Sequence, residues 1–326
     1  MVSYGDVKTR RLVDVILLSV LVTVLPDPLV GQTPETRPPV IDVHVHTPHV
    51  PLHPDTVDRT MEWLRERLAV MDSLNVRRAV LNGVPALLYP WHEQAPDRFI
   101  PALFFPCENG RDPNYGYRCY ESGEDFPEVG RVHDALQAGR IEALGEVTAQ
   151  YLGIAPTDPR LEPYFELAEE HDVPVFIHMV AGPPSAAYEE GPAPVRSPNY
   201  SASAGNPMKL EEVLSRHRDL RVAVMHAGWP MLSEMVTMLQ LHPNVYVDTG
   251  ILQYMLPRAE YYRYLRRLVT AGFGKRIMFG SDGGPELLRE GIAAIREAEF
   301  LTEEQKQDIL CDNAARFLRL DENVCR

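Results

Sequence analysis

The sequence predicts a single-domain (β/α)8 TIM barrel behind an N-terminal export segment, and three observations predict this fold. From residue 40 onward, eight short apolar runs alternate with amphipathic stretches, the pattern of repeated strand–helix units. The runs are almost wholly apolar, as expected of parallel strands covered on both faces. Polar residues able to bind metal or move protons end five of the eight runs, where barrel active sites form.

The elements follow one another along the chain in strand–helix order. Each helical stretch places apolar residues three or four positions apart. The expected strands are residues 40–46, 78–81, 100–105, 141–147, 173–179, 222–226, 245–248 and 276–281. The expected helices are residues 61–74, 132–138, 161–171, 210–217, 231–241, 260–270, 286–299 and a closing helix 303–318.

The connections after three strands should shape the catalytic face. Residues 106–126 and 180–209 are long, and the connection around 89–96 is shorter. In a barrel such loops follow the carboxyl ends of strands and usually line the substrate pocket. A doubly wound open sheet is the rival fold, but no GxGxxG follows the first strand, so a dinucleotide-binding version has no support.

The N-terminal segment has the pattern of an export signal. A basic start, Lys8, Arg10 and Arg11, precedes an apolar run over 15–25 that is too short to span a bilayer comfortably. We expect a signal-peptidase site at residues 29–31.

These features set the expected domain organisation. We expect residues 1–31 to be a signal peptide, 32–39 a flexible leader and 40–326 the barrel, giving an exported protein that is periplasmic or extracellular. An uncleaved membrane anchor through residues 12–25 is the alternative.

The charge of the chain limits its partners. The formal net charge is −14, which argues against nucleic acid and against a polybasic membrane contact. We therefore expect a small-molecule substrate and no stable membrane insertion after cleavage of the signal. The sequence leaves a homo-oligomer open.

Four cysteines, Cys107, Cys119, Cys311 and Cys325, allow three disulfide connectivities in an exported chain. The local pairings Cys107–Cys119 and Cys311–Cys325 are the simplest, and four unpaired thiols are the alternative. No pair has the CxxC spacing of a zinc knuckle or a redox site.

Candidate site residues lie at the strand ends. His44 and His46 end the first strand, and their i, i+2 spacing directs both imidazoles to one face. The later strands supply the other candidates, namely Glu146, His178, His226 and Asp282. One of these residues alone is more often a satisfied polar side chain, but the joint pattern predicts a metal site with an open position for water.

At these residues the chain resembles the amidohydrolase superfamily, most closely its amidohydrolase-related (amidohydrolase 2) branch. The resemblance covers about residues 40–320. It rests on Ile41-Asp42-Val43-His44-Val45-His46, Gly145-Glu146-Val147, Phe176-Ile177-His178, Val224-Met225-His226-Ala227-Gly228, Gly280-Ser281-Asp282 and the Asn313-Ala314-Ala315-Arg316 of the closing helix.

The resemblance implies a role for each residue. His44, His46 and His178 would be metal ligands. Asp282 would be a ligand or lie just outside the ligands, and would be the general base. His226 would bind a second metal or stabilise an oxyanion. Many relatives carry a bridging carboxylated Lys on strand four, where this chain has Glu146, so Glu146 either bridges two ions or supports a single one.

The expected cofactor is a divalent metal, one ion or two. Zinc suits a histidine-rich site best, and manganese, iron and cobalt are compatible. Such an ion lowers the pKa of bound water toward about 7.

The leading functional prediction is a metal-dependent hydrolase that activates this water to cleave a carboxylic ester, lactone or amide. The first alternative is a non-oxidative decarboxylase of a small aromatic or unsaturated carboxylic acid, and the second is a non-catalytic metal-binding barrel.

Further candidate pocket residues lie in the loops. For each of them, a solvent-exposed loop side chain without a role in the site is an alternative of at least equal weight. They are His49, His53, Trp91, His92, Arg111, Tyr115, Tyr117, Arg196, Tyr200 and Trp229. A free arginine in the pocket would favour a substrate that carries a carboxylate.

Overall fold

The computed structural model describes residues 37–48, 54–108, 110–111, 119–120, 122–188 and 197–326. The predicted signal peptide and most of the predicted leader lie outside these residues. Within the described part, no helix combines the length and apolar character needed to cross a bilayer.

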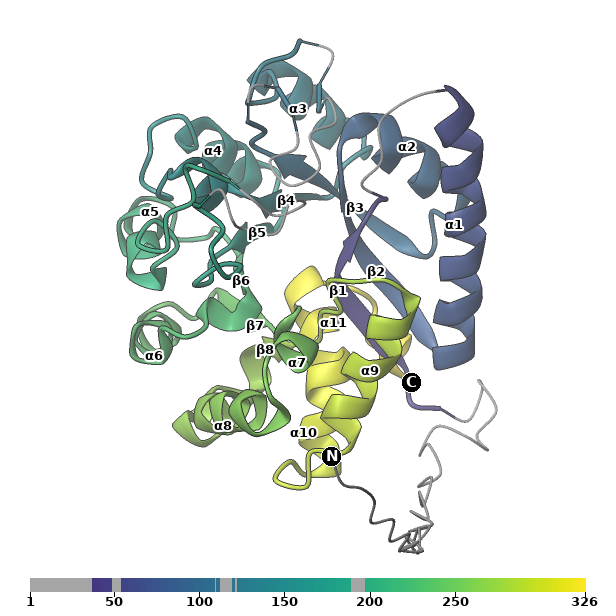
Figure 1. The fold of residues 1–326 in the computed structure, drawn as a ribbon, viewed down its shortest axis with the longest axis vertical. Helices are drawn as coiled ribbons and strands as arrows, with labels where there is room; N and C mark the ends of the chain where they lie inside the picture. The colour runs from purple at the N-terminus through teal and green to yellow at the C-terminus, as the bar shows by residue number, and fades with distance from the viewer. Residues whose placement is uncertain (1–36, 49–53, 109, 112–118, 121, 189–196) are drawn as a thin grey trace, which may run out of the picture. The chain divides into compact units, whose positions relative to one another are not determined.

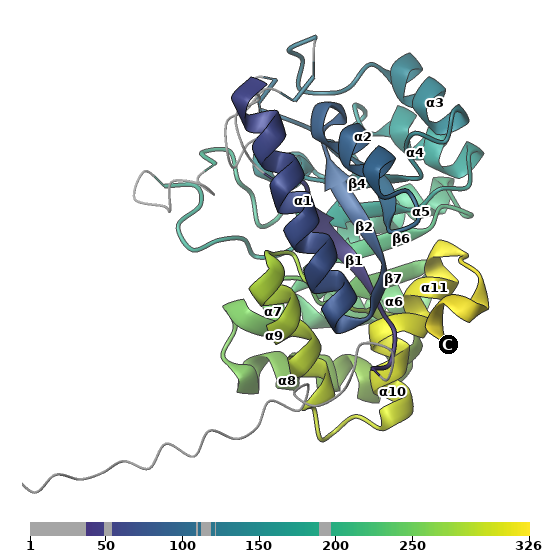
Figure 2. The same cartoon turned by 90° about the vertical axis from the view of Figure 1, so that its right-hand side faces the viewer.

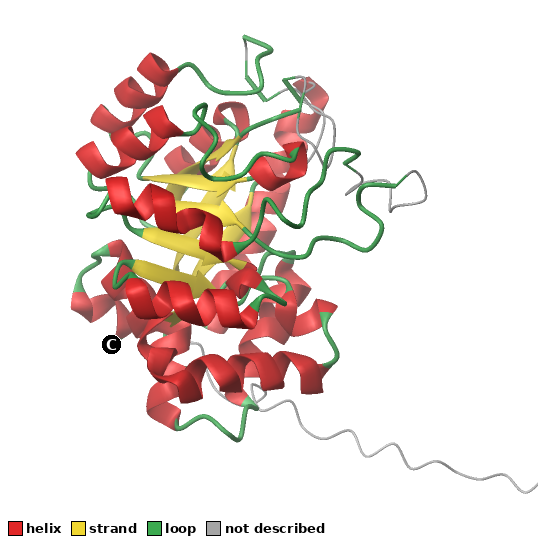
Figure 3. Ribbon diagram, turned by 90° about the vertical axis from the view of Figure 1, so that its left-hand side faces the viewer, coloured by secondary structure: helices red, strands yellow, loops and turns green. Residues whose placement is uncertain are grey.

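Eight parallel strands form one sheet in sequence order, which confirms the predicted barrel-type architecture. Helices surround the sheet on its outer side (Figures 1 and 3). The strands are β1 Val40–His46, β2 Val76–Gly83, β3 Phe99–Phe105, β4 Ala143–Val147, β5 Val175–His178, β6 Val222–Met225, β7 Val245–Asp248 and β8 Ile277–Met278.

The helices follow the strands as the alternating pattern predicts. They are α1 Pro54–Leu74, α2 Pro85–Gln94, α3 Val129–Gln137, α4 Glu162–Glu170, α5 Leu210–Arg216, α6 Leu232–Leu241, α7 Leu252–Met255, α8 Arg258–Leu268, α9 Pro285–Arg296, α10 Glu303–Gln307 and α11 Asn313–Leu318. Figure 2 shows the longest of them, α1, lying over β1 and β2.

The prediction of a loop around residues 89–96 was wrong, because helix α2 occupies most of it. Pro85 stands at the start of this helix, where its missing N–H costs nothing. Pro90 inside the helix obscured the pattern. Trp91 is consequently a core residue, 1% exposed, with its ring 6.3 Å from that of Phe99.

The sheet is nearly closed into a barrel at the seam between β8 and β1. β8 has only two residues, fewer than the predicted 276–281, and no regular ladder joins it to β1. Instead, Val43 N donates to Phe279 O at 3.0 Å and Asp282 N donates to His44 O at 2.8 Å. Ser281 N donates to the buried carboxylate of Asp42 at 2.8 Å. Side-chain and irregular backbone bonds therefore replace the missing ladder.

The C-terminal segment packs against the interior side chains of the barrel. Cys311, Ala314 and Phe317 share one buried cluster with residues of β1 to β6 and β8, among them Ile41 and Phe176. The predicted closing helix 303–318 is interrupted at Asp308–Asp312 by a π-helical turn. Within that turn the carbonyl of Ile309 accepts a hydrogen bond from Phe279 N at 2.8 Å, so one turn of the closing segment is tied to the barrel seam.

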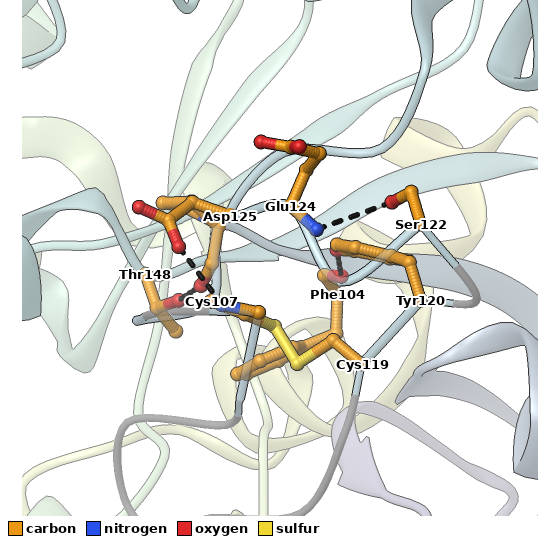
Figure 4. Close-up of a disulfide and its surroundings, with 10 residues drawn as sticks. Phe104, Cys107, Cys119, Tyr120, Ser122, Glu124, Asp125 and Thr148 are labelled. Atoms are coloured by element: carbon orange, nitrogen blue, oxygen red, sulfur yellow. Dashed lines mark hydrogen bonds between the residues drawn. A yellow bond between two sulfur atoms is a disulfide. The ribbon is translucent and has the colours of Figure 1, made fainter.

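Both local disulfides that the spacing favoured are present, Cys107–Cys119 and Cys311–Cys325. The second fastens the C-terminal turn Glu322–Cys325 to the π-helical turn. The first lies in the connection after β3 (Figure 4). There Tyr120 Oη donates to Phe104 O at 2.6 Å, and Cys107 N donates to Asp125 O at 2.7 Å. The disulfide thus holds this connection against the end of β3.

Candidate metal centre

The six strand-end residues singled out in the sequence converge on one place. His44 and His46 come from β1, Glu146 from β4 and His178 from β5. His226 and Asp282 lie directly after β6 and β8. The side chains of all six are at most 15% exposed. Because parallel strands end at the same rim of the barrel, residues far apart in sequence come within contact distance there.

Two β-bulges, one in β1 and one in β4, lie at the site residues and affect the direction of their side chains. Between Asp42 and Val45, β1 advances three residues while β2 advances two, from Ala79 to Leu81. A bulge of this kind adds one residue to a strand and redirects the side chains that follow it.

The same irregularity recurs in β4. It advances three residues from Leu144 to Val147, whereas β5 advances two, and β3 also advances two. The bulge contains Gly145 and Glu146, which a cis peptide joins. Both β1 and β4 therefore carry a bulge at or next to a site residue.

Four atoms form a compact group at the ends of β1, β4 and β8, which we call group 1: His44 Nε2, His46 Nε2, Glu146 Oε2 and Asp282 Oδ1. The two Nε2 atoms are 3.2 Å apart, and each lies 3.3 Å from Asp282 Oδ1. Glu146 Oε2 is 3.1 Å from His46 Nε2 and 3.7 Å from His44 Nε2. Tetrahedral zinc with nitrogen and oxygen ligands has edges of roughly 3.3–3.6 Å. His44, His46 and Asp282 are therefore spaced as ligands of one ion, and Glu146 Oε2 lies beside the two imidazoles.

A second set of residues, group 2, contains Glu146, His178 and His226. The other oxygen of Glu146, Oε1, is 3.5 Å from His226 Nε2 and 4.0 Å from His178 Nε2. One oxygen of Glu146 therefore belongs to group 1 and the other to group 2. The structure places His178 with His226 in group 2, apart from the two histidines of β1. A carboxylate in this position can bridge two ions.

Hydrogen bonds at Nδ1 leave Nε2 of three histidines available as a ligand atom. His44 Nδ1 donates to Asp248 Oδ2 at 3.1 Å, and His178 Nδ1 donates to Gln150 Oε1 at 2.9 Å. His226 Nδ1 donates to Gly250 O at 3.1 Å. In a neutral imidazole with its proton on Nδ1, Nε2 carries the lone pair. Metal-binding histidines in proteins are oriented by such partners.

Sequence reasoning missed Asp248 and Gln150. Asp248 is fully buried, and its Oδ1 accepts hydrogen bonds from His226 N and Gly250 N. It ends β7, so its strand-end position could have identified it. Gln150 follows β4, and its amide is fixed by donation to Val180 O at 2.6 Å. Nothing in its local sequence marks it.

Close backbone approach around His44 requires two glycines. A Cβ at Gly280 would lie 2.7 Å from His44 Cβ, and one at Gly250 would lie 2.6 Å from His44 Nδ1. Nearby, His226 and Asp282 themselves have left-handed backbones, with φ of 57° and 50°. Non-glycine residues adopt this conformation at a cost of about 1–3 kcal/mol, most often at functional sites.

Comparison with known proteins agrees with this geometry. The family model Amidohydro_2, described as amidohydrolase, matches residues 137–320, more than half of the chain. The chain belongs to the amidohydrolase family. The family is metal-dependent, and groups 1 and 2 contain two of the side-chain sets that could hold a metal in the described part of the chain. A search of curated proteins found no match to this amidohydrolase.

Solved structures share its fold. A 5-carboxyvanillate decarboxylase from Sphingomonas paucimobilis is 16% identical with a TM-score of 0.57, over 87% of this chain and 99% of that one. A probable 2-pyrone-4,6-dicarboxylic acid hydrolase from Acinetobacter baumannii is 15% identical with a TM-score of 0.57, over 86% and 99%.

A third such structure was solved with a metal. It is the 5-carboxyvanillate decarboxylase of Novosphingobium aromaticivorans in complex with manganese, 12% identical with a TM-score of 0.55, over 87% of this chain and 96% of that one. At these identities the three likenesses show the fold alone.

The electrostatics of the amidohydrolase site favour a bound cation. Burial alone would lower the pKa of His44, but the charges of Asp282 and Asp248 outweigh it and raise this pKa well above its usual value. Burial would also lower the pKa of His46, but its hydrogen bonds to the carboxylates of Asp282 and Glu146 outweigh burial and raise this pKa to about 9. These carboxylates create a buried negative field that a divalent ion would neutralise.

The remaining ionisable groups fit this arrangement. Burial lowers the pKa of His178 to about 3, so its imidazole is neutral at physiological pH. Burial would raise the pKa of Glu146, but hydrogen bonds from His226 and His44 hold it well below its usual range. Burial also opposes ionisation of Asp282, yet the charge of His44 lowers its pKa. Both carboxylates are therefore ionised and could serve as ligands.

Aromatic side chains form part of the wall around the site. The rings of Phe104 and His46 meet edge to face at 6.4 Å. The ring centroid of Tyr200 lies 6.2 Å from that of His178, and the ring centroid of Tyr151 lies 4.9 Å from it. Of the loop candidates, Tyr200 reaches the histidines. Trp229 instead packs near α8, where its Nε1 donates to Glu260 at 3.4 Å.

The other loop candidates contribute less. His92 is half-buried in the last turn of α2, and the backbone of Arg111 pairs with Glu108. His49, His53, Tyr115, Tyr117 and Arg196 lie outside the described residues.

Replacement of Asp248 should weaken metal binding without removing a ligand. In Asp248→Asn, His44 loses its charged partner, so we expect metal affinity to fall about 10- to 100-fold. Competition with a chelating dye measures the affinity. Asp97→Asn, at an exposed carboxylate, is the matched control and should bind metal as the wild type does. Equal affinity in both variants would remove the orienting role of Asp248.

Metal uptake should release protons near neutral pH. With a metal-free pKa of about 9, His46 holds its proton below that pH, and a ligand must lose it. The affinity should therefore rise from pH 6 to pH 8 and level off above about pH 9. Calorimetric titration at pH 7 in buffers of different ionisation enthalpy measures the released protons. A metal affinity that does not change with pH would contradict the raised pKa of His46 and the effect of the neighbouring carboxylates on it.

Proposed function

We propose that this amidohydrolase is a metal-dependent hydrolase of a carboxylic ester, lactone or amide. The single observation that supports it best is group 1, in which the two imidazoles of β1 and the carboxylate of Asp282 are spaced as ligands of one ion, with Glu146 beside the imidazoles. Zinc is the proposed metal, since nitrogen and carboxylate ligands at tetrahedral spacing suit it. A divalent ion held there supplies a Lewis acid and lowers the pKa of water toward about 7.

We further propose that the site takes two ions, with Glu146 between them. Group 1 offers four ligand atoms, and group 2 adds His178, His226 and the second oxygen of Glu146. Because His226 Nδ1 donates to Gly250, neutral His226 presents a lone pair and no proton at Nε2. This geometry favours His226 as a ligand of the second ion over its role as a donor to an oxyanion.

Asp282 is the proposed general base. Its Oδ1 lies 3.3 Å from both histidines of β1, and its Oδ2 lies 3.8 Å from His226 Nδ1. The carboxylate therefore spans the space between the two groups. Ionised by its histidine neighbours, Asp282 can accept a proton from the attacking water and pass it to the leaving group. Phe104, Tyr151 and Tyr200 exclude bulk water from this side.

A decarboxylase of a small aromatic or unsaturated acid is the second candidate. The observation that favours it is His226, whose pKa the charges of Glu146 and Asp282 raise against the effect of burial. An imidazolium there can deliver the proton that replaces carbon dioxide on the substrate carbon. Two of the similar solved structures described above are decarboxylases by name.

We also propose that the protein is exported. Two disulfides in a chain of this size are typical of oxidising compartments, which agrees with the signal predicted over residues 1–31.

A substrate panel separates the candidate reactions. Purified protein of known metal content should be assayed with lactones, esters, amides and phenolic carboxylates. The proposed hydrolase should release acid, followed by pH-stat, without carbon dioxide. Evolution of carbon dioxide from a phenolic carboxylate would favour the decarboxylase. Metal-loaded protein that is inactive on the whole panel would favour a non-catalytic barrel.

Asp282→Asn should separate metal binding from turnover. Asparagine keeps an oxygen that can remain a ligand but cannot accept the proton, so kcat should fall about 10²- to 10⁴-fold while metal content is retained. His46→Ala is the comparison and should lose metal and turnover together. Metal content by mass spectrometry and kcat on the best panel substrate check both variants. An Asp282→Asn enzyme with normal kcat would exclude the general-base role.

A further inference from the structure

A further cluster of side chains that could bind a metal lies outside the barrel mouth, between helices α3 and α4. His133 comes from α3, while Glu170 ends α4 and His171 caps it. Each offers one ligand atom, and these three atoms lie within 4.8 Å of one another. The two helices pack side by side on the outer ring (Figures 1 and 2). The cluster therefore joins two elements that are separate in sequence.

Contacts around these residues leave them available to a ligand. The rings of His133 and His171 meet edge to face, with centroids 5.1 Å apart. Nε2 of His171 is covered from solvent and has no hydrogen-bond partner among the described residues. A covered ring nitrogen without a partner costs free energy that a bound ion would recover.

We propose that His133, Glu170 and His171 form a surface zinc site, distinct from the catalytic centre. Two imidazoles and one glutamate are a ligand set that zinc uses, with a fourth position left to water. Separations of up to 4.8 Å exceed the tetrahedral edge of roughly 3.3–3.6 Å, so the side chains must close on the ion. His133 is 38% exposed and Glu170 is exposed, which leaves both free to rotate.

An ion at this site would cross-link the two helices that flank β4, the strand that carries Glu146. Helix α3 precedes β4 and α4 follows it, so an ion shared by the two helices would cross-link the elements on both sides of that strand. Asp134 adds negative charge nearby, with Oδ1 3.6 Å from His133 Nδ1. An ion that binds only the folded chain stabilises it in proportion to the logarithm of its concentration.

Titration of the metal-loaded enzyme with Zn²⁺ tests this site. With the catalytic centre already filled, the wild type should bind one further equivalent by calorimetry. Excess Zn²⁺ should also raise Tm by about 2–5 °C. His133→Gln and His171→Gln should each weaken this event about ten-fold or more, since losing a ligand should cost at least as much affinity as losing an orienting partner. Catalytic metal content should stay unchanged.

His242→Gln is the matched control, since His242 caps α6 as His171 caps α4, and it should bind the further equivalent normally. Glu170→Gln gives a second test at an exposed side chain, and it should also weaken binding of the further equivalent. The proposal fails if the wild type binds no further Zn²⁺. It also fails if the event survives in His133→Gln, His171→Gln and Glu170→Gln, or is lost equally in His242→Gln.

Discussion

The placement of one buried carboxylate, Glu146, organises the mouth of this barrel. Its two oxygens lie on opposite sides, one toward the histidine pair of β1 and the other toward His178 and His226. An ionised carboxylate 5% exposed is tolerated only where opposite charge or hydrogen bonds compensate for its lost hydration. The histidines around Glu146 therefore need either protons or metal ions, and their orienting partners at Nδ1 favour metal.

The barrel seam connects the fold to this site. β8 is too short to form a ladder with β1, so the two strands are joined by Asp282 N donating to His44 O and by Ser281 N donating to Asp42. These bonds involve the site residues themselves or their neighbours. Asp282 and His44 are consequently held at a fixed separation by the same contacts that close the sheet. Such preorganisation is what a metal site or a general base requires.

Much of this arrangement could be predicted from the sequence, and the reasons are physical. The order of strands and helices follows from hydrophobic periodicity, and the convergence of His44, Glu146 and His226 follows from parallel strands ending at one rim. Helix α2 was missed because Pro90 lies within it. The division into two groups around Glu146 depends on bulges in β1 and β4, and a one-residue change of register leaves no pattern in a single sequence.

The site also sets a balance between stability and function. Burying four histidines with three carboxylates, and holding His226 and Asp282 in left-handed backbones, costs free energy that an apolar barrel mouth would not incur. The apolar end of the barrel, where Phe317 packs 5.7 Å from Phe176, contributes hydrophobic burial that offsets this cost. A bound ion adds to the stability of the folded state alone. The apolar end of the barrel thus supplies stability, and the polar end holds the site whose free-energy cost this stability offsets.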